Sequence, residues 1–372
     1  MKKVNGHQII QLFEEFSPKG LAVEGDPVGL QIGRLNQTVQ RVLIALDVVE
    51  EVVDEAIDKG VKLIIAHHPI IYRPLKTIQT DQPAGRVIAK LIQHDIAVYT
   101  AHTNLDVTEG GVNDLLARQL ELTDTKVLSQ TAEDRFKKLV VFTPKSHENE
   151  LRDAMAEAGA GYIGAYSHCT FTSAGTGRFK PTIEADPYIG EANQLEEVEE
   201  VRIETIIYDS IEKRVIRAME KAHPYEEVAY DLYEEARPGK QLGLGRVGYL
   251  QKPMKLREFI EYVKMKFDVP ALRYVGNPDA EVKKVAVLGG TGNRYMNAAR
   301  FSGADVYITG DVEYHTAHDA KMMGLNIIDP GHNIEKVMKA GTAEEMKVRC
   351  LESNFDVEFI PSSINTDPFS FD

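Results

Sequence analysis

The 372-residue chain contains no tryptophan and only two cysteines, Cys169 and Cys350, which lie far apart in the sequence. So few cysteines are typical of a reducing compartment, and they exclude a zinc site built from thiolates. The amino-terminal segment lacks the continuous apolar run of a signal peptide, and no stretch of the chain approaches the ~20 apolar residues that span a membrane. We therefore expect a cytoplasmic protein without a membrane partner, in which histidines and carboxylates hold any metal.

Positive charge is also scarce. Asp and Glu number 57 against 43 Lys and Arg, which gives a net charge of −14 at pH 7, and no local basic patch stands out. Because such a field repels a phosphate backbone, we expect no nucleic-acid partner. A composition with 43% hydrophobic and 27% charged residues is typical of a globular protein, and the length indicates two or three domains.

Strand and helix patterns alternate near both ends of the chain, which is typical of α/β architecture. The first series has predicted strands at 41–48, 61–68 and 96–102, with helices at 51–59 and 85–93. The second series has predicted strands at 283–290, 304–311 and 325–332, with helices at 295–302 and 314–323. We interpret these series as two similar α/β halves.

The middle of the chain follows a different order. Strands are predicted at 136–144, 169–181, 200–209 and 228–234, with helices at 148–158 and 211–221. This βαββαβ order forms a ferredoxin-like sandwich that closes its own core. We therefore expect a first α/β half at 1–130, an inserted α+β ferredoxin-like domain at 131–244 and a second α/β half at 245–372.

Polar residues gather where the predicted parallel strands end. In the stretch "IAHHPII", His67 and His68 follow an apolar strand, and Pro69 prevents further ladder pairing. Three other loops occupy the same position at the end of a strand: His102 to Asp106, Thr309 to Asp311, and His332 to Glu335. Because ligands collect outside the carboxyl ends of parallel strands, we expect these loops to line one cleft.

Three imidazoles and two carboxylates from such loops suit two divalent ions, with one carboxylate bridging them. His332 and Glu335 are three residues apart, so they share one face of any helix that begins there. The ions would lower the pKa of a bound water and provide a hydrolytic nucleophile. Hydrogen-bonding loop histidines explain the same residues, and the residue pattern alone leaves both interpretations open.

Five stretches together resemble the NIF-three-like family, whose members carry the label GTP cyclohydrolase 1 type 2 homologue: "GDPVGLQIG", "AHHPIIYRPLK", "AHTNLDVTEGGVND", "ITGDVEYHTAHDA" and "DPGHNIEKVM". The resemblance covers 1–130 and 245–372, and the insert resembles the ferredoxin-like domain of longer bacterial members. It implies a toroidal homohexamer with two divalent ions per subunit facing an internal cavity. By motif match the metal ligands are His67, His68, Asp106 and His332, with Glu335 as the bridge.

Many relatives have the glutamate four residues after the last histidine, whereas Glu335 follows His332 by three; either spacing keeps the two on one helical face. Zinc is the ion we expect in a crystal, and Mn, Fe, Ni or Co are alternatives because His and carboxylate donors accept several ions.

Other polar residues are candidates for supporting roles. Asp47, Asp311 and Asp329 lie near strand ends, where a carboxylate can orient a ligating imidazole. Further candidates are Thr103 and Asn104 for substrate or water, and His315 for proton transfer, with a solvent-facing position as its alternative. His102 has the weakest claim among the strand-end histidines. The sequence "GGTGN" at 289–293 lacks a full nucleotide-binding pattern, so we predict a tight turn.

Two functions remain open on these grounds. The first is a metal-dependent hydrolase with a metal-activated water, and the family label points to opening of the guanine ring of GTP or of a related nucleotide. The second is a non-catalytic metal-binding scaffold or regulator, whose inserted domain senses a small molecule. An activity screen combined with elemental analysis separates the two.

Overall fold

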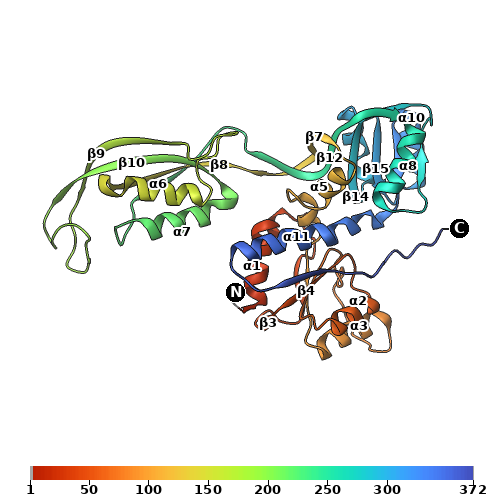
Figure 1. Ribbon diagram of the computed structural model, residues 1–372, viewed down its shortest axis with the longest axis horizontal. Helices are drawn as coiled ribbons and strands as arrows, with labels where there is room; N and C mark the ends of the chain where they lie inside the picture. Colours follow the sequence, from red (N-terminus) through yellow and green to blue (C-terminus); the bar gives the residue numbers. More distant parts are fainter. Residues whose placement is uncertain (1–2, 372) are drawn as a thin grey trace. The chain divides into compact units, whose positions relative to one another are not determined.

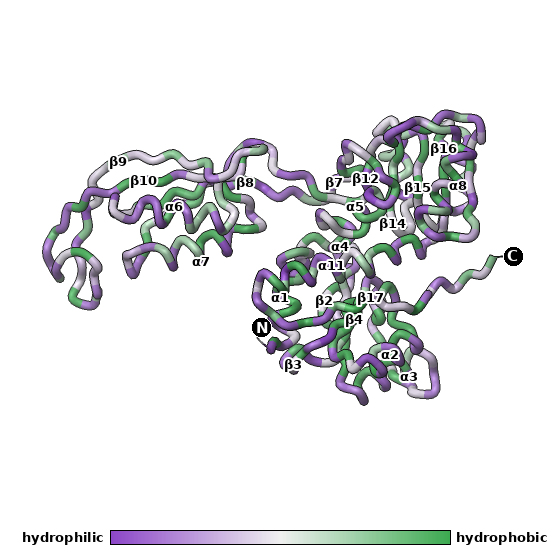
Figure 2. The backbone as a smooth tube through the Cα atoms, in the orientation of Figure 1, coloured by the Kyte–Doolittle hydropathy of each residue, from purple (hydrophilic) through white to green (hydrophobic). Residues whose placement is uncertain are grey.

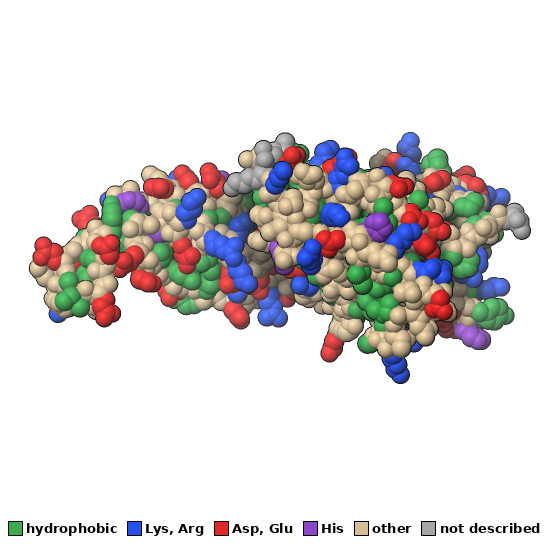
Figure 3. All heavy atoms as spheres, turned by 90° about the horizontal axis from the view of Figure 1, so that it is seen from below, with side chains coloured by type: hydrophobic (Ala, Val, Ile, Leu, Met, Phe, Trp, Pro, Cys, Tyr) green, Lys and Arg blue, Asp and Glu red, His purple; other side chains and the backbone are tan. Residues whose placement is uncertain are grey.

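The computed structural model describes residues 3–371, and the chain divides into two compact units (Figure 1). Unit 1 comprises Met1–Ala132 and Leu242–Asp372, and unit 2 comprises Glu133–Gln241. Across residues 3–371, none of the helices combines the length and apolar character needed to cross a bilayer. On the face shown in Figure 3, Lys and Arg side chains are interspersed with Asp and Glu.

The first sheet of unit 1 has five strands in the order β17-β4-β5-β6-β2. The first four strands are parallel, and the last is antiparallel to its neighbour: β17 (Glu358–Pro361), β4 (Arg41–Ala45), β5 (Leu63–Ala66), β6 (Ala97–Thr100) and β2 (Gly29–Ile32). The central strands are apolar along their length because both faces are buried. One face packs on α2 (Glu50–Asp58) and α3 (Pro83–Gln93), and the other on α1 (Gly6–Phe16).

The second sheet of unit 1 has six strands in the order β13-β16-β15-β14-β12-β7. Its parallel centre consists of β14 (Glu281–Thr291), β15 (Val306–Gly310) and β16 (Asn326–Asp329). The flanking strands are β13 (Arg273–Val275), antiparallel to β16, β12 (Lys240–Lys255), antiparallel to β14, and β7 (Thr123–Asp134) at the edge. Figure 2 shows hydrophobic residues along the strands of both sheets.

One hydrophobic core is shared by the two sheets of unit 1. It combines Ile44 and Ile65 of the first sheet with Val287 and Ile308 of the second. Four helices that the sequence analysis did not predict supply much of the rest: α1, α5 (Val112–Gln119), α8 (Leu256–Phe267) and α11 (Val337–Glu352). The strands and helices that it did predict in the two halves are all present, including α9 (Met296–Phe301) and α10 (Tyr314–Met323).

Unit 2 contains a four-stranded antiparallel sheet in the order β11-β8-β10-β9. Its elements follow the predicted succession: β8 (Phe136–Pro144), α6 (Glu148–Glu157), β9 (Thr170–Phe179), β10 (Glu196–Tyr208), α7 (Glu212–Ala222) and β11 (Tyr230–Glu234). Both helices cover the same face of the sheet, where Leu151 and Val215 pack against Val141 and Ile203 (Figure 1). Unit 2 therefore has a hydrophobic core of its own.

Candidate metal centre

The strand ends of both sheets of unit 1 meet at one group of side chains. His67 and His68 directly follow β5, and His102 lies two residues after β6. From the second sheet, His332 begins a 3₁₀ turn after β16, and that turn also carries Glu335. Because each of these strands ends in a parallel part of its sheet, the loops beyond them converge, as expected for parallel strands.

Glu335 lies at the centre of this group and is 2% exposed. Its Oε2 is 3.0 Å from His68 Nε2, 3.2 Å from His332 Nε2 and 3.6 Å from His67 Nε2. Asp106 Oδ1, from α4 (Thr103–Val107), is 3.7 Å from His67 Nε2. The structure thus brings together the five residues that the family resemblance named as ligands.

Three overlapping groups of these side chains place their ligand atoms within 4.8 Å of one another and could hold a metal ion. The first group is His67, Asp106 and Glu335, and the second is His68, His332 and Glu335. These two groups share Glu335. The third group adds His102 to His67 and His68.

The second ring nitrogen of every histidine in the group is held by an oxygen. The Nδ1 contacts are His68 with Asp47 Oδ1 at 2.7 Å, His332 with Asp311 Oδ2 at 2.7 Å, His102 with Asp26 Oδ1 at 2.7 Å, and His67 with Ala101 O at 2.9 Å. Each ring therefore has Nε2 left as its potential ligand atom, and in His68 and His332 this atom contacts Glu335 Oε2. Metal-binding imidazoles are typically fixed through the other nitrogen in this way, which ordinary loop histidines do not require.

Two buried atoms favour a cation at this position. Among residues 3–371, His67 Nε2 and Asp106 Oδ1 have no hydrogen-bond partner, although both are buried. Burying unpaired polar groups is costly. Burial raises the pKa of Asp106 to about 6 against the attraction of His67. A divalent ion would satisfy both atoms, and the set of imidazole and carboxylate donors suits Zn²⁺ and similar ions.

Protons stabilise the same cluster when no ion is bound. Burial opposes a charge on His68, but hydrogen bonds to Asp47 and Glu335 outweigh it and raise its pKa to about 10. Burial likewise opposes a charge on His332, and its contacts with Glu335 and Asp311 raise its pKa to about 9. Burial alone would raise the pKa of Glu335, but the neighbouring His67 and the hydrogen bonds from the imidazoles hold it well below its usual value. Protons and metal ions therefore compete for these atoms.

The cluster forms part of a cleft of ≈ 1170 Å³ in unit 1. Aromatic side chains line it, among them Tyr72, Tyr295 and Phe369, together with the exposed Arg294. The last residues described, from Thr366 onward, contribute to the same wall. A concave, partly aromatic site with a few convergent polar groups is the usual form of a small-molecule site.

The glycines of "GGTGN" serve the cluster directly. Gly289 and Gly290 lie in the last residues of β14, which continues through Thr291, so the predicted tight turn is replaced by the strand end and a 3₁₀ turn that begins at Asn293. The two glycines also make room for Glu335. A Cβ on Gly290 would lie 2.8 Å from Glu335 Oε1 and 3.3 Å from His332 Nε2, and Gly290 has φ of +63°. This role was not predicted from the sequence, although a glycine pair at the end of a central strand was a visible signal of it.

The remaining candidates lie in different surroundings. Thr103 lines the cleft and donates to Asp26, whereas Asn104 is buried and donates to Ser17 O and Oγ. His315 is exposed on α10 beside Tyr314 and does not line the cleft. Asp47 and Asp311 orient imidazoles, as their position at strand ends indicated, but Asp329 pairs with Arg273 and accepts from Val312 N. His102, which had the weakest claim from the sequence, joins one of the candidate groups and is held by Asp26.

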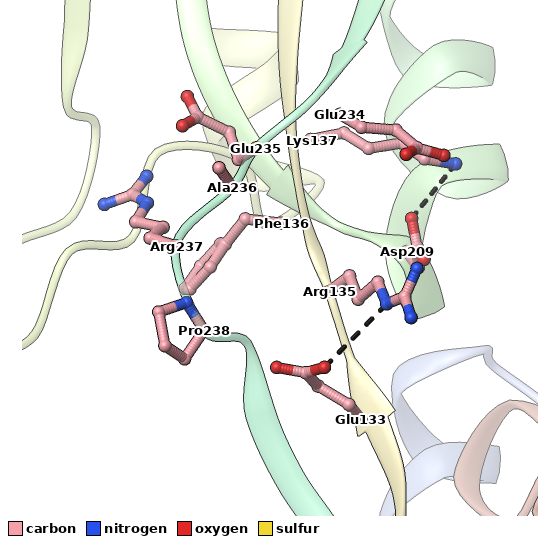
Figure 4. A pocket seen from close by; sticks show the side chains of 10 residues that line it. All are labelled: Glu133, Arg135, Phe136, Lys137, Asp209, Glu234, Glu235, Ala236, Arg237 and Pro238. Atoms are coloured by element: carbon pink, nitrogen blue, oxygen red, sulfur yellow. Dashed lines mark ion pairs between the residues drawn. The ribbon is translucent and has the colours of Figure 1, made fainter.

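A second pocket of ≈ 400 Å³ lies in unit 2 (Figure 4). Its cations already have partners: Lys137 lies 3.0 Å from Asp209, and Arg135 lies 3.8 Å from Glu133. The guanidinium of Arg237 covers the ring of Phe136 at 4.6 Å. Because two of its three cations are paired with carboxylates and no histidine lines it, we take the cluster around Glu335 as the candidate functional site.

Comparisons with known proteins agree over the whole chain. The model of the family Duf34/NIF3 (NGG1p interacting factor 3) matches residues 4–368. A Bacillus subtilis protein named GTP cyclohydrolase 1 type 2 homolog is 58% identical over 370 residues, covering 100% of this chain and 99% of the relative. A Halalkalibacterium halodurans protein of the same name is 56% identical and covers 100% of both chains. The crystal structure of a Bacillus cereus protein related to NIF3 is 57% identical, covers 100% of both chains and has a TM-score of 0.92.

Proposed function

This chain belongs to the Duf34/NIF3 family, and from that membership and the cluster around Glu335 we propose that it is a metal-dependent hydrolase with two divalent ions per subunit. One observation carries the proposal. Four imidazoles are held at Nδ1 by a carboxylate or a backbone carbonyl, and this leaves their Nε2 atoms as the potential ligand atoms beside two buried carboxylates.

We assign His67 and Asp106 to one ion, His68 and His332 to the other, and Glu335 to both. The two candidate groups that share Glu335 support this division. Zinc is the ion we expect, with Mn, Fe, Ni or Co as alternatives. Bound ions would supply a water of lowered pKa and a positive charge that polarises the substrate.

Other residues of the cleft would handle the substrate. Asp26 holds Nδ1 of His102, so Nε2 of His102 is available to move a proton to or from a leaving group. Arg294 is placed to anchor an anionic part of the substrate, and Tyr72 and Tyr295 to contact a planar one. The name of the Bacillus subtilis relative points to GTP, so hydrolytic opening of its guanine ring is the first reaction to test.

The test compares three purified proteins after metal loading: wild type, His67→Ala and His315→Ala. We expect two ions per chain and consumption of GTP for wild type and His315→Ala, because His315 lies outside the cleft. His67→Ala removes one donor of the candidate group and should lose metal and turnover. Equal turnover by wild type and His67→Ala would refute the hydrolase proposal.

A second candidate function is a metal-binding scaffold or regulator. Unit 2 favours it, because that unit has a hydrophobic core of its own and could carry a separate small-molecule site. This function predicts stoichiometric metal without turnover in a screen of nucleotides, phosphoesters and cyclic amides.

We also propose that unit 2 is a ferredoxin-like domain, since its strand order β11-β8-β10-β9 with two helices on one face supports that topology. The corresponding division of the chain is 1–130, 131–244 and 245–372. For the assembly we propose a cytoplasmic toroidal hexamer, on the basis of the family. Sedimentation of the purified protein tests the hexamer, and a monomer under assay conditions would contradict it.

A further inference from the structure

Three histidines of the candidate centre are each held by an aspartate that is itself held by a threonine. Asp47 binds His68 Nδ1 through Oδ1 at 2.7 Å and accepts from the Thr366 hydroxyl through Oδ2. Asp311 Oδ2 accepts from Thr291 Oγ1 at 2.8 Å and lies 2.7 Å from His332 Nδ1. The third example combines Thr103, Asp26 and His102: the threonine hydroxyl lies 2.5 Å from Asp26 Oδ2, and Asp26 Oδ1 lies 2.7 Å from the ring.

Two of these relays have the same topological origin. In the second sheet, Thr291 ends β14, Asp311 follows β15 and His332 follows β16, and these three parallel strands are neighbours in this order. In the first sheet, Thr366 lies beyond β17, Asp47 beyond β4 and His68 beyond β5, and these strands are again parallel neighbours in this order. The two sheets thus build the same Thr–Asp–His relay across three consecutive strands, and in the first sheet the threonine comes from the carboxyl-terminal segment.

The relays have a physical task in a metal centre. A carboxylate that makes only one hydrogen bond can rotate about its side-chain torsions and release the imidazole nitrogen. A hydroxyl donor to the same carboxylate restricts that rotation, so the ring keeps Nε2 aimed at the centre. A solitary threonine–aspartate contact would be an ordinary loop hydrogen bond. Here three such contacts each fix the orientation of a different histidine of the same cluster.

We propose that Thr366, Thr291 and Thr103 are positioning residues that set the metal affinity of the centre by fixing the aspartates behind His68, His332 and His102. The inference rests on the proposed metal-binding function and assigns roles to residues outside the set of ligands. Thr366 brings the carboxyl-terminal segment into the centre, since it lies 319 residues from Asp47 in the sequence.

The experiment measures Zn²⁺ affinity of the metal-free full-length protein by competition with a chromophoric chelator. We expect Thr366→Val and Thr291→Val to bind Zn²⁺ about tenfold more weakly, the lower end of the effect of removing an outer partner of a metal-bound imidazole. Thr366→Ser retains the hydroxyl and should stay within about twofold of wild type. Thr100→Val is the matched control, because the Thr100 hydroxyl is buried in β6 without a hydrogen-bond partner.

A double-variant cycle separates positioning from a general structural effect. If Thr366 acts through Asp47, then Thr366→Val should add little to the loss already caused by Asp47→Asn. Circular dichroism of each metal-free variant checks folding, and Thr366→Ser keeps the test informative if a valine variant unfolds. Wild-type affinity in both valine variants overturns this inference alone. Failure of the wild-type protein to bind Zn²⁺ overturns the proposed metal centre, and this inference with it.

Discussion

Glu55 offers a quantitative test of how the carboxyl-terminal segment is anchored. Its carboxylate on α2 is 8% exposed and accepts hydrogen bonds from Lys59 Nζ at 2.7 Å, Ser362 Oγ at 2.5 Å, and Ser363 N and Oγ at 2.9 and 2.7 Å. Burial alone would raise the pKa of Glu55, but the bonds from Lys59 and the serines outweigh it and lower the pKa to about 2. Thr366 lies three residues after Ser363, so by holding Ser363 the Glu55 carboxylate also helps to position the Thr366–Asp47–His68 relay.

The lowered pKa gives the size and the pH range of the effect. A carboxyl with a pKa of 4.5 in the unfolded chain and about 2 in the folded protein contributes about 3 kcal/mol to the free energy of unfolding. Since the folded-state pKa is the lower one, this contribution is complete above pH 4.5 and is lost as the pH falls toward 2. By linkage, about 1.4 kcal/mol of it is gone at pH 3.5.

We therefore expect Glu55→Gln to lower the free energy of unfolding by up to about 3 kcal/mol at pH 7, and by clearly less at pH 3.5. Urea unfolding followed by circular dichroism measures the difference, and hydrogen exchange of 358–364 reports the local loosening. Glu358→Gln on β17 is the control, because its ion pair with Arg41 is exposed and should contribute less than about 1 kcal/mol. A Glu55→Gln effect that is equal at both pH values would refute the reasoning.

Two further substitutions test close packing and a buried cation in unit 1. Gly290→Ala should weaken Zn²⁺ binding, measured with a competing chelator, because the added Cβ displaces Glu335. Gly324 also has positive φ but has no atom within 4 Å of an added Cβ, so Gly324→Ala should leave the affinity unchanged. Equal affinities of the two variants would contradict the close approach of Gly290 to Glu335. Arg246→Leu should lower the free energy of unfolding by up to about 3 kcal/mol, because it leaves the partly buried Asp114 without the buried cation that it pairs with. Adding Asp114→Leu should restore much of that loss in urea unfolding, and no recovery would show that the pair itself is not the cause.

The strands of both halves could be predicted because their burial leaves a direct trace in the sequence. β5 and β15 are buried on both faces, so continuous apolar runs mark them, and the polar residues that follow mark the ends. The polar residues after these apolar runs include His67 and His68, and the turn with His332 follows a third such run. Their convergence then followed from the rule that parallel strands present their carboxyl ends at one edge.

The helices of the shared core were missed for different reasons. α1 has an apolar stripe that includes Ile9, Phe13 and Phe16, and helical periodicity could have identified it. α11 buries Thr342, Ala343 and Cys350 beside its methionines, so its buried face contains small and polar residues and leaves a weak periodic signal. Tertiary packing rather than local pattern defines such a helix.

The orienting residues were harder to predict because their partners are distant in the sequence. Asp26 lies 76 residues from His102, and Thr366 lies 319 residues from Asp47. Neither pair has a local pattern that distinguishes it from ordinary loop polarity. Asp47 and Asp311 were identified as candidates only because they share the strand-end position with the histidines they orient.

The division of the ligands between the halves links metal binding to the stability of unit 1. His67, His68 and Asp106 come from the first half, whereas His332 and Glu335 come from the second, so each ion would bridge segments of both halves, which also meet in the shared core. A ligand that binds only the folded state stabilises it by about 2.7 kcal/mol at a hundred times its dissociation constant. Zn²⁺ should therefore raise the unfolding temperature of unit 1. Unit 2 has a separate core and supplies no residue of the three candidate groups, so its own unfolding should not respond to the ion. Equal stabilisation of both units in a hydrogen-exchange experiment would mean that the ion acts outside the cluster around Glu335.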